Sequence, residues 1–214
     1  MELTRFTPDD FAQMDQLYRR NLVNCLSGFK SLNLVGTLNQ QGVTNVAPFS
    51  QVFHIGANPA LMGMLVRPDT VPRHTLSNLV ETQYFTFNHV RESFYQAAHQ
   101  TAARYEESEF DATGLTPEFS PTHPAPYVQE AHIKIGLKFA EKHPLAINGT
   151  ILVIGSVVEV WVPAACLQPD GFIDLAAAGT ICSTGLDAYY NAQPIARLAY
   201  AKPNKPVTKL AEEE

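Results

Sequence analysis

Short apolar runs separated by turn residues make up most of the hydrophobic pattern of this 214-residue chain. The runs are bounded by residues such as Gly, Pro, Asn or Asp, as strands usually are. The runs that we predict to be strands cover residues 31–39, 43–54, 60–67, 83–90, 131–140 and 150–162. The sequence NQQGV after the first run predicts a turn, so the first two strands are expected to form a hairpin. Many strands at short spacing favour a mainly β fold, a β-barrel with added helices.

The N-terminal segment predicts a helix. Thr7 can cap a helix, Pro8 suits its first turn, and the acidic residues that follow stabilise the positive end of the helix dipole. Apolar residues then recur at helical spacing, at Phe11, Met14, Tyr18 and Leu22. We therefore predict an amphipathic helix over about 8–22.

Two further segments have a helical pattern. Leu76, Leu79 and Val80 give one apolar face to a helix predicted over about 73–82. Residues 91–103 are also expected to be helical.

Residues 104–130 are rich in proline, and we predict a long surface excursion there. The longer segment 91–130 either covers a ligand site or serves as a dimer arm. No convincing linker divides the chain, so we expect a single domain over residues 1–214, with a barrel core over about 30–162 and a C-terminal extension over 163–214.

The run over 43–54 is unusual for a strand, because small polar residues and a proline interrupt it. Pro48 cannot donate a ladder hydrogen bond, which predicts a sheet edge or a bulge. Asn45, Ala47 and Ser50 leave room beside the backbone for a flat polar ligand. The alternative is an irregular edge strand whose polar residues face solvent, and the pattern leaves both open.

A second candidate site lies in RPDTVPRHT, residues 67–75, where a strand ends and a helix begins. The unpaired N–H groups and partial positive charge of a helix N-terminus attract anions. Arg67 and Arg73 add side chains suited to phosphate, and Thr75 adds a hydroxyl donor. The alternative is an ordinary helix cap with solvated charges. Two arginines in an acidic protein need counter-charge, which favours the anion.

Three further positions stand out in the predicted strands. Asn88 and His89 end one strand, where the pair either turns toward the same cleft or faces water. Gly155 interrupts another strand and indicates a bulge or a close approach of the backbone.

Composition narrows the classes of function. The formal net charge of −6 argues against a nucleic-acid-binding surface, which needs clustered Lys and Arg. No apolar run approaches the roughly 18 residues of a membrane span, and the first ten residues lack the apolar core of a signal peptide. Three widely spaced cysteines without a CxxC motif suit a reducing compartment, so we expect a cytoplasmic protein.

Several kinds of catalytic site find no support in the sequence. The seven histidines show neither HxH nor HxxxH spacing, so no metal site is expected. The chain also lacks the GxSxG, P-loop and GxGxxG motifs, which argues against an elbow-type serine hydrolase and a phosphate-loop enzyme.

Taken in order, five segments resemble the flavin reductase-like family, whose fold is the FMN-binding split barrel. The segments are GVTNVAPFS, NPALMGMLV, RHTLSNLVETQYFTFN, SEFDATGLT and ILVIGSVVEV. They occur in the order of the family and at plausible spacing. The later stretch GLDAYYNAQPIARLAYAKP is similar to the Gly- and Tyr-containing ending of the family.

The resemblance implies a homodimer that holds FMN non-covalently in a cleft between the barrel and the partner subunit. By position, the residues implied to line the flavin ring and ribityl chain are Asn45, Ala47, Pro48, Phe49 and Ser50. Those implied to approach the phosphate are Arg67, Arg73, His74 and Thr75, with Asn88 and His89 nearby. Family members often pass a hydride from NADH or NADPH to the flavin, which then carries the redox chemistry.

One stretch departs from the family pattern. Many members carry a His in a Gly-Asp-His-like turn, associated with nicotinamide binding, before a strand that ends Gly-Glu-Val. Here Thr150 stands near that place and Ser156 replaces the Glu. The sequence therefore leaves two main functions open: an FMN-binding oxidoreductase that uses NADH or NADPH and serves a small-molecule redox partner, or an FMN-binding electron carrier or sensor without a nicotinamide site. A split-barrel protein without a cofactor is a third.

Overall fold

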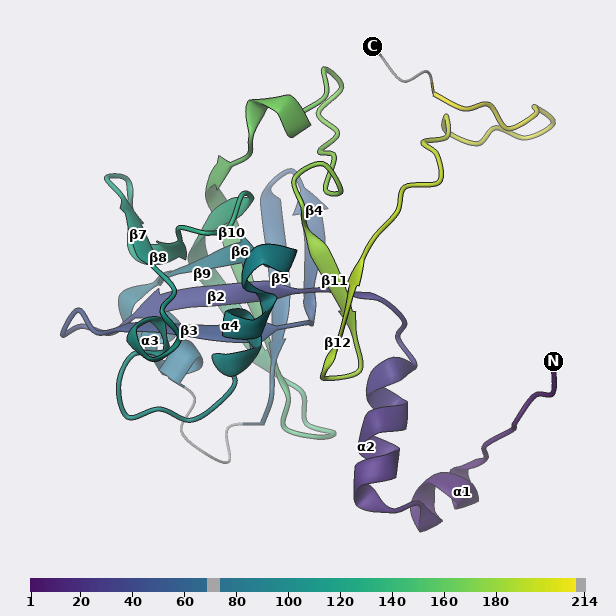
Figure 1. Ribbon diagram of the computed structural model, residues 1–214, viewed down its shortest axis with the longest axis horizontal. Coiled ribbons are helices and arrows are strands. Elements are labelled where there is room, and N and C mark those ends of the chain that lie inside the picture. The colour runs from purple at the N-terminus through teal and green to yellow at the C-terminus, as the bar shows by residue number, and fades with distance from the viewer. Residues whose placement is uncertain (69–73, 211–214) are drawn as a thin grey trace.

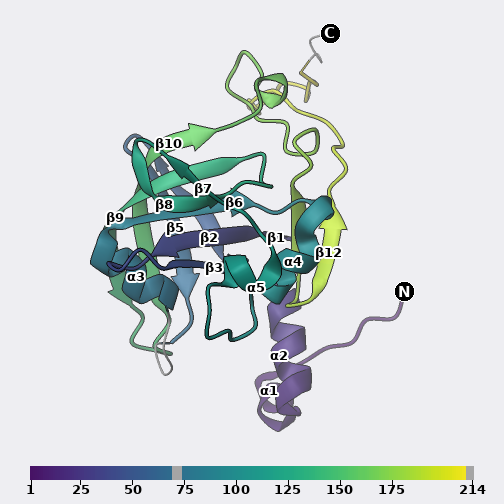
Figure 2. The same ribbon diagram turned by 60° about the vertical axis from the view of Figure 1, so that its left-hand side comes forward.

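The structure of the protein, a computed structural model, describes residues 1–68 and 74–210. Its centre is a seven-stranded antiparallel sheet that rolls into a barrel (Figures 1 and 2). Across the sheet the strands are β3 (Thr44–Phe49), β2 (Asn33–Leu38), β6 (Tyr84–His89), β9 (Lys134–Pro144), β10 (Ile151–Trp161), β5 (Ala60–Val66) and β4 (Val52–Ala57). All the predicted runs contain strands, which confirms the mainly β fold with added helices.

The two edge strands of the sheet, β3 and β4, follow each other directly in the chain. The strand predicted over 43–54 is therefore two strands, because the chain bends between them to take β4 to the far edge. The Leu65 N–H donates to the Gln51 carbonyl (3.0 Å), and the Ser31 hydroxyl donates to the Val52 carbonyl (2.7 Å). These bonds hold the bend at the place where the barrel is split.

The β2–β3 hairpin has the turn and the edge that its sequence predicts. The Asn39 side-chain oxygen accepts the N–H groups of Gln41 (3.0 Å) and Val43 (2.9 Å). Gly42 adopts a φ of +81°, which glycine reaches without strain. Pro48 lies in β3 at the edge of the sheet, where no further strand needs its missing N–H.

Apolar side chains pack on both faces of β2 and β6 and form the two larger of three apolar clusters. The first core fills the barrel and includes Val35 and Phe87. The helix α3 (His74–Thr82) packs against β2, β3 and β6 and adds Leu79 to this core. The predicted helix over 73–82 is confirmed except at Arg73, which lies outside the described residues.

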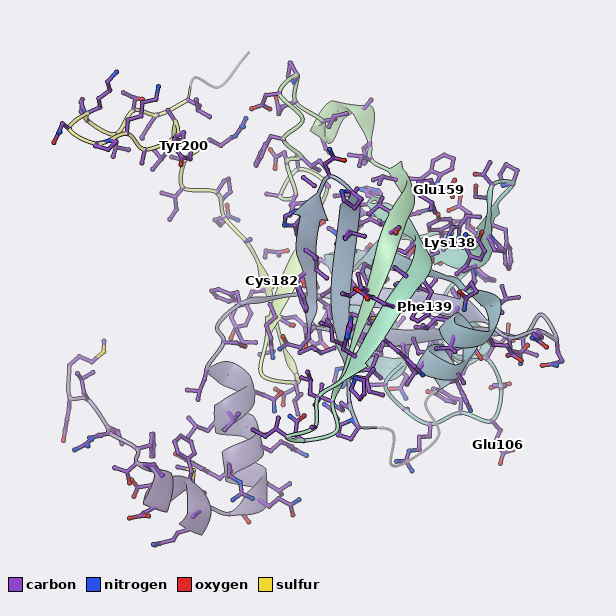
Figure 3. The ribbon with its side chains drawn as sticks, turned by 180° about the vertical axis from the view of Figure 1, so that it is seen from behind. Glu106, Lys138, Phe139, Glu159, Cys182 and Tyr200 are labelled. Atoms are coloured by element: carbon purple, nitrogen blue, oxygen red, sulfur yellow. The ribbon has the colours of Figure 1, made fainter. Side chains whose placement is uncertain are left out.

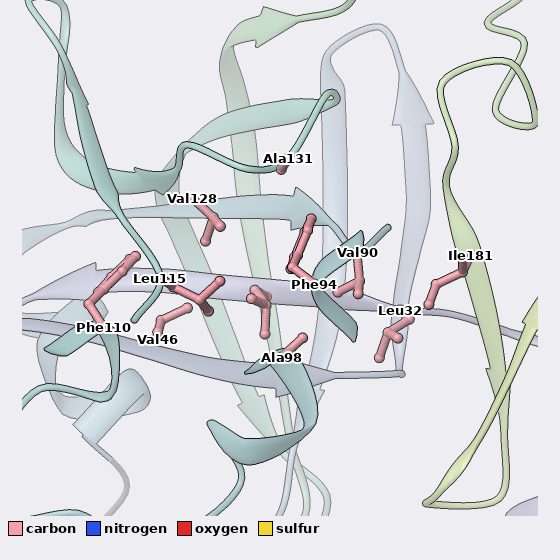
Figure 4. Packing of buried hydrophobic residues seen from close by; sticks show 11 residues of the cluster. Leu32, Val46, Val90, Phe94, Ala98, Phe110, Leu115, Val128, Ala131 and Ile181 are labelled. Atoms are coloured by element: carbon pink, nitrogen blue, oxygen red, sulfur yellow. The ribbon is translucent and has the colours of Figure 1, made fainter. Parts of the chain in front are cut away.

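The second core lies on the outer face of β3, β2 and β6 (Figure 4). The 3₁₀ helix η1 (Glu92–Phe94) and the helices α4 (Tyr95–Gln100) and α5 (Glu109–Thr113) cover it. They contribute the buried side chains of Phe94, Ala98 and Phe110. The helical prediction over 91–103 is confirmed for most of its length.

The prediction of a surface excursion over 104–130 is wrong for much of the segment. β7 (Pro117–Ser120) and β8 (His123–Val128) form a hairpin, and β8 is buried against β6 and β2. The Thr86 hydroxyl donates to the Pro126 carbonyl (2.6 Å), and the Val128 N–H donates to the Asn88 side chain (2.9 Å). The prolines are tolerated in β8 because this strand pairs with β7 only.

The helix predicted over 8–22 is in fact two helices, α1 (Pro8–Gln13) and α2 (Gln16–Cys25). Asp15 separates them because its side chain accepts the N–H groups of Leu17 (2.9 Å) and Tyr18 (3.1 Å) and so caps α2. α1 begins after the predicted cap, Thr7. Within the described ranges, no helix is long and apolar enough to cross a membrane.

A small second sheet joins segments from both halves of the chain. β1 (Lys30–Ser31) pairs with β11 (Ile181–Thr184), which pairs with β12 (Ala188–Asn191). A 3₁₀ helix, η2 (Ala164–Cys166), lies between β10 and β11 in the chain. Beyond β12 the chain runs away from the barrel (Figure 1).

Gly155 lies where β10 presses against the barrel core. The pairing of β10 with β9 shifts register between Ile154 and Gly155. A Cβ atom placed on Gly155 would lie 2.6 Å from Phe85 Cζ and 3.1 Å from Leu137 Cδ2. The sequence predicts a bulge or a close approach here, and the structure has both.

Replacing Gly155 with alanine should lower the free energy of unfolding by about 1–3 kcal/mol, the usual cost of overpacking a filled core. Ser156→Ala is the matched control, because the side chain of Ser156 points to the other face of β10, and it should change that free energy by less than about 0.5 kcal/mol. Urea unfolding followed by circular dichroism measures both. Equal stability of the two variants would contradict the close approach.

Candidate functional site

Three of the predicted ligand-binding residues share one face of β3. Asn45, Ala47 and Phe49 alternate along the strand and so point the same way. Their register partners in β2 are Thr37, Val35 and Asn33. Val35 and Phe49 belong to the barrel core, so this face of β3 looks into the barrel.

The other two predicted residues of this stretch, Pro48 and Ser50, do not lie on the inward face of β3. Pro48 pairs with Leu34 of the second core, so it faces the other side of the sheet. Ser50 is partly buried at the bend between β3 and β4. From Asn45 to Ser50 the chain spans about 17 Å, at roughly 3.4 Å per residue. We call the inward row of Asn45, Ala47 and Phe49, with Ser50 at its end, the β3 track.

A buried polar cluster connects the β3 track to the first turn of α3. Asn45 Nδ2 donates to the hydroxyl oxygens of Thr37 (3.1 Å) and Thr75 (3.1 Å). Asn78 Nδ2 donates to the same Thr37 oxygen (3.3 Å). All four residues are buried. The two candidate stretches of the sequence therefore meet in one place.

The chemistry of this meeting point suits an anion. The Thr75 hydroxyl accepts a hydrogen bond from Asn45 and keeps its own hydrogen for donation. Thr75 lies in the first turn of α3, where backbone N–H groups have no partner within the helix. That turn contains no acidic residue. The N–H groups and the helix dipole therefore add to the attraction for a negative group.

Two of the other residues predicted near a phosphate lie within the described residues. Arg67 is exposed and follows β5 directly. His74 is exposed and is the first residue of α3, and its carbonyl accepts the Ser77 hydroxyl (3.0 Å). Arg73 lies outside the described residues, so its predicted contact stays a prediction.

The turn between β9 and β10 lies beside Pro68. A Cβ atom placed on Gly149 would lie 3.5 Å from Pro68 Cβ. Thr150, which stands near the place of the family's nicotinamide-associated His, follows Gly149 in this turn. The turn that carries the departure from the family pattern therefore lies beside Pro68, the residue that follows Arg67.

Asn88 lies on the other side of the sheet from the β3 track. Its Nδ2 donates to the Leu34 carbonyl (3.0 Å) and the Thr86 hydroxyl (2.9 Å), while its Oδ1 accepts the Val128 N–H (2.9 Å). Both ends of the amide are engaged and the residue is fully buried. Asn88 therefore ties β8 to the sheet, and its predicted approach to a ligand stays a prediction.

His89 faces the same side as the β3 track, toward the end where β3 bends. Its register partner in β2 is Asn33, and its Nδ1 lies 3.2 Å from the Thr180 hydroxyl oxygen. Burial lowers the pKa of His89 to about 4. The imidazole is therefore neutral at pH 7 and can donate or accept a hydrogen bond without adding positive charge.

Sequence reasoning missed Thr37 and Asn78, the residues that complete the polar cluster. Each leaves a weak signal. Thr37 is a polar residue within the apolar run NLVGTL, and Asn78 follows Thr75 by one helical turn. Unpaired buried polar groups are unfavourable. A polar residue on a buried strand face is therefore expected to hydrogen-bond with a polar residue on the helix face that packs against it.

Sequence reasoning also missed the cover over the outer edge of β3. The Glu109 carboxylate, from α5, accepts the Val46 N–H (3.2 Å). Ser108 and Thr44 share a hydrogen bond between their hydroxyls (2.8 Å). No local pattern signals these contacts, because they join residues more than 60 positions apart.

A second polar cluster holds the β7–β8 hairpin against β10. The Glu159 carboxylate accepts hydrogen bonds from Tyr127 (2.6 Å), Ser120 (3.1 Å) and Thr122 (2.5 Å). Burial alone would raise the pKa of Glu159, but these bonds hold it below its ordinary value. In the part of the chain that the structure describes, no three His, Cys, Asp or Glu residues gather as a metal site requires.

Comparison with known protein families and sequences gives a consistent result. Residues 29–174 match the family model described as a flavin reductase-like domain. The chain is 30% identical over 204 residues to the protein YwrF of Bacillus subtilis, an alignment that covers 89% of this chain and 93% of the relative.

Solved structures share the fold. A candidate flavin reductase with a split barrel domain, from Shewanella frigidimarina, is 49% identical with a TM-score of 0.90, over 92% of this chain and 100% of that one. Nitrilotriacetate monooxygenase component B of Bacillus cereus is 23% identical with a TM-score of 0.75, over 100% and 98% of the two chains. These likenesses confirm the split-barrel fold expected from the sequence.

The depressed pKa of His89 predicts a specific dependence of stability on pH. The folded value of about 4 lies below the ordinary value of 6.5, so the unfolded state binds more protons between these limits. Stability is therefore full above pH 6.5 and falls as the pH is lowered toward 4, by up to about 3 kcal/mol for this group.

The variant His89→Gln should lack this part of the pH dependence, while His54→Gln, at an exposed histidine, should keep it. Urea unfolding at a series of pH values between 4 and 7 measures the free energies of unfolding. Identical slopes for the wild-type protein and His89→Gln would show that His89 is not buried in its neutral form.

Proposed function

The chain belongs to the flavin reductase-like family, and we propose that it is an FMN-binding oxidoreductase. In this proposal it takes a hydride from NADH or NADPH and passes electrons to a small-molecule redox partner. A flavin-related redox function follows from the family. FMN as the bound flavin and the nicotinamide as the donor are the parts that we add.

The junction of Asn45 and Thr75 is the observation that carries the proposal. FMN has a flat ring, a polyol chain and a terminal phosphate, so it needs an apolar surface, a polar track and an anion site in that order. The β3 track and the first turn of α3 offer these in sequence along one side of the barrel. The residues that we propose near the phosphate are Thr75, His74, Arg67 and Arg73.

The residues of the β3 track suit the remainder of FMN. Ala47 leaves space beside the backbone, where a larger side chain would fill the path. Phe49 offers apolar surface, and Ser50 places a hydroxyl at the split edge. Pro48 faces the other core and acts through the backbone, because its ring fixes φ and removes an edge N–H. His89 is neutral and can meet the ring as a donor or an acceptor.

FMN, when bound, supplies the hydride acceptor and the carrier of electrons. The residues of the chain bind and orient it, and no acid–base triad is needed for that task. Asn45 holds Thr75 in place through the buried amide, so the hydroxyl is fixed before the phosphate arrives. The Glu109 contact covers the outer edge of β3, which limits access to the split side of the barrel.

A second function is favoured by one specific observation. Thr150 stands in the β9–β10 turn near the place where many family members carry a His associated with nicotinamide binding. A Thr cannot provide an imidazole contact there. The alternative function is therefore an FMN-binding electron carrier or sensor without its own nicotinamide site.

We also propose that the protein is a cytoplasmic homodimer. The three cysteines are free, which suits a reducing compartment. Large apolar side chains are exposed on the N-terminal helices and on β4, and a second subunit would cover them.

The variant Thr75→Ala should weaken the binding of FMN about tenfold or more, the effect of one lost hydrogen bond to a charged group. Riboflavin has no phosphate, so its dissociation constant should change little. Quenching of flavin fluorescence in a titration measures both constants. The proposed phosphate contact fails if the two ligands lose the same affinity.

Two control variants separate this effect from damage to the helix. Thr75→Ser keeps the hydroxyl and should restore most of the FMN affinity. Thr82→Ala removes a hydroxyl that donates to the Asn78 carbonyl (2.9 Å) at the other end of α3, and it should leave FMN affinity unchanged.

Anaerobic mixing of the FMN-loaded protein with NADH or with NADPH distinguishes the two functions. The oxidoreductase should lose its flavin absorbance near about 450 nm with at least one nucleotide, because a hydride enters the ring. Chemical reduction with dithionite gives the amplitude of complete bleaching. Bleaching by dithionite and by neither nucleotide would exclude the reductase and leave the carrier or sensor.

A further inference from the structure

The β7–β8 hairpin and the end of β10 form a small hollow, which we call the hairpin hollow. Its lining residues are Glu118, Phe119, Ser120, Pro121 and Tyr127 of the hairpin and Trp161 of β10. The hollow has a volume of about 60 Å³. Pockets that enclose a whole small molecule start at roughly 300 Å³, so the hairpin hollow has room for a headgroup only.

The hairpin hollow lies on the outer side of the sheet, whereas the β3 track looks into the barrel. Tyr127 and Glu159 pack over Gly136 of β9, where a Cβ atom would lie 2.9 Å from Glu159 Cγ and would overlap the Tyr127 hydroxyl. Gly136 pairs with Thr86, whose hydroxyl donates to the Pro126 carbonyl of the outer strand β8. Figure 3 shows Glu159 near the end of β10. The hairpin hollow is therefore separate from the proposed flavin site.

Three aromatic rings line the hairpin hollow. Phe119 and Trp161 are 55% and 51% exposed, and Tyr127 is buried. The Tyr127 hydroxyl (2.6 Å) and the Trp161 indole N–H (3.4 Å) donate to the same oxygen of Glu159, so both rings are held in place. A single exposed aromatic side chain needs no explanation, but three rings at one hollow offer a surface on which a ligand can pack.

The side chains at the hairpin hollow leave one negative charge without a cation. Glu118 forms an ion pair with Lys134, so these two charges cancel. Within the described ranges, no Lys, Arg or His forms an ion pair with Glu159. Burial alone would raise the pKa of Glu159, but its hydrogen bonds hold the pKa below its ordinary value, so the carboxylate is charged at pH 7. A bound organic cation would supply the missing positive charge.

The hydrogen bonds of Glu159 indicate which kind of cation fits. A carboxylate has about four acceptor positions. Tyr127 and Trp161 donate to Oε1, and Ser120 (3.1 Å) and Thr122 (2.5 Å) donate to Oε2. The N–H groups of a primary ammonium ion would therefore find no free acceptor on Glu159. A quaternary ammonium group has no N–H, and aromatic rings attract it through cation–π interactions.

We propose that the hairpin hollow binds the quaternary ammonium headgroup of a small soluble molecule, with the rings of Phe119, Tyr127 and Trp161 against the cation and Glu159 as its counter-charge. The remainder of that molecule lies outside the hollow, which has no room for it. This inference goes beyond the proposed flavin chemistry and does not rest on it.

A fluorescence titration with choline tests the site directly. Trp161 is the single tryptophan of the chain, so the tryptophan emission of the full-length protein reports on the hairpin hollow. We expect a saturable change in this emission. The neutral isostere 3,3-dimethylbutan-1-ol and the primary amine ethanolamine should each bind at least about tenfold more weakly, because the first lacks the charge and the second needs acceptors.

Three results of this titration would overturn the proposal. One is the absence of a saturable change with choline, with no heat of binding in calorimetry. Another is equal affinity for choline and its neutral isostere, which would mean that the hollow is only apolar. The third is tighter binding of ethanolamine than of choline.

The variant Phe119→Leu keeps an apolar side chain and removes one ring. It should raise the dissociation constant of choline about fivefold, the effect of one cation–π contact. Phe29→Leu is the matched control, because Phe29 is 67% exposed and its ring packs on Tyr190, away from the hairpin hollow. This control should leave the constant unchanged. Equal effects of the two substitutions would contradict the site.

The variant Glu159→Gln tests the counter-charge. It should weaken the binding of choline and leave the binding of the neutral isostere unchanged, because only choline carries a charge. Unchanged affinity for choline would exclude Glu159 as the counter-charge. If the substitution loosens the hairpin, both ligands lose affinity, and Phe119→Leu, at an exposed position, then decides.

Vesicles of phosphatidylcholine present the same headgroup on a membrane and so distinguish the two sources of this headgroup. We expect the protein to stay in the supernatant when such vesicles are sedimented. Cosedimentation of the wild-type protein but not of Phe119→Leu would overturn the assignment to a soluble molecule.

Discussion

The burial of β2 and β6 on both faces is the constraint on which the rest of the structure depends. Apolar cores on either side exclude water from these strands, so a buried polar side chain there is unfavourable unless it is hydrogen-bonded. Among the described residues Asn33 is an exception, because its Oδ1 atom is buried without a partner. On the barrel side, Thr37 is paired by Asn45 and by Asn78 of α3. On the outer side, Thr86 and Asn88 are paired with the backbone of β8. The same constraint therefore fixes the positions of the helix α3 and the strand β8.

The candidate site is a consequence of this pairing. Asn45 must satisfy two amide hydrogens in a buried place, and it does so by fixing the hydroxyls of Thr37 and Thr75. The first turn of α3 is thereby held beside the edge strand β3, at the side where the barrel is split. In this family the flavin carries the redox chemistry, so the residues of the chain have the task of holding and orienting the flavin. Rigid, paired polar groups suit that task.

The barrel is asymmetric in how its outer walls are covered. One wall is covered by elements of its own chain, α4, α5 and β8, and has a well-packed second core. The other wall, formed by β4, β5 and β10, keeps apolar residues partly exposed. The projecting N-terminal helices α1 and α2 also carry apolar residues, and none of their residues is buried.

The sequence by itself predicted the runs that contain the seven strands of the main sheet, and most of the helices. These features depend on neighbouring residues: the alternation along β3, the cap at Thr7, the turn at Gly42 and the helix start at 74. It also determined that Gly155 needs space, because a strand interior rarely carries glycine without reason.

Only the tertiary structure decided which of these features meet. Asp15, by contrast, splits the first helix through a local cap, which competes with an equally regular apolar pattern. The proline-rich segment before residue 130 became a buried strand because Asn88, 40 residues earlier, accepts its Val128 N–H. Asn45 and Thr75, which are 30 residues apart in the chain, are likewise joined by a hydrogen bond between buried side chains. Such pairings depend on contacts between distant segments, and burial makes them obligatory once the two cores have formed.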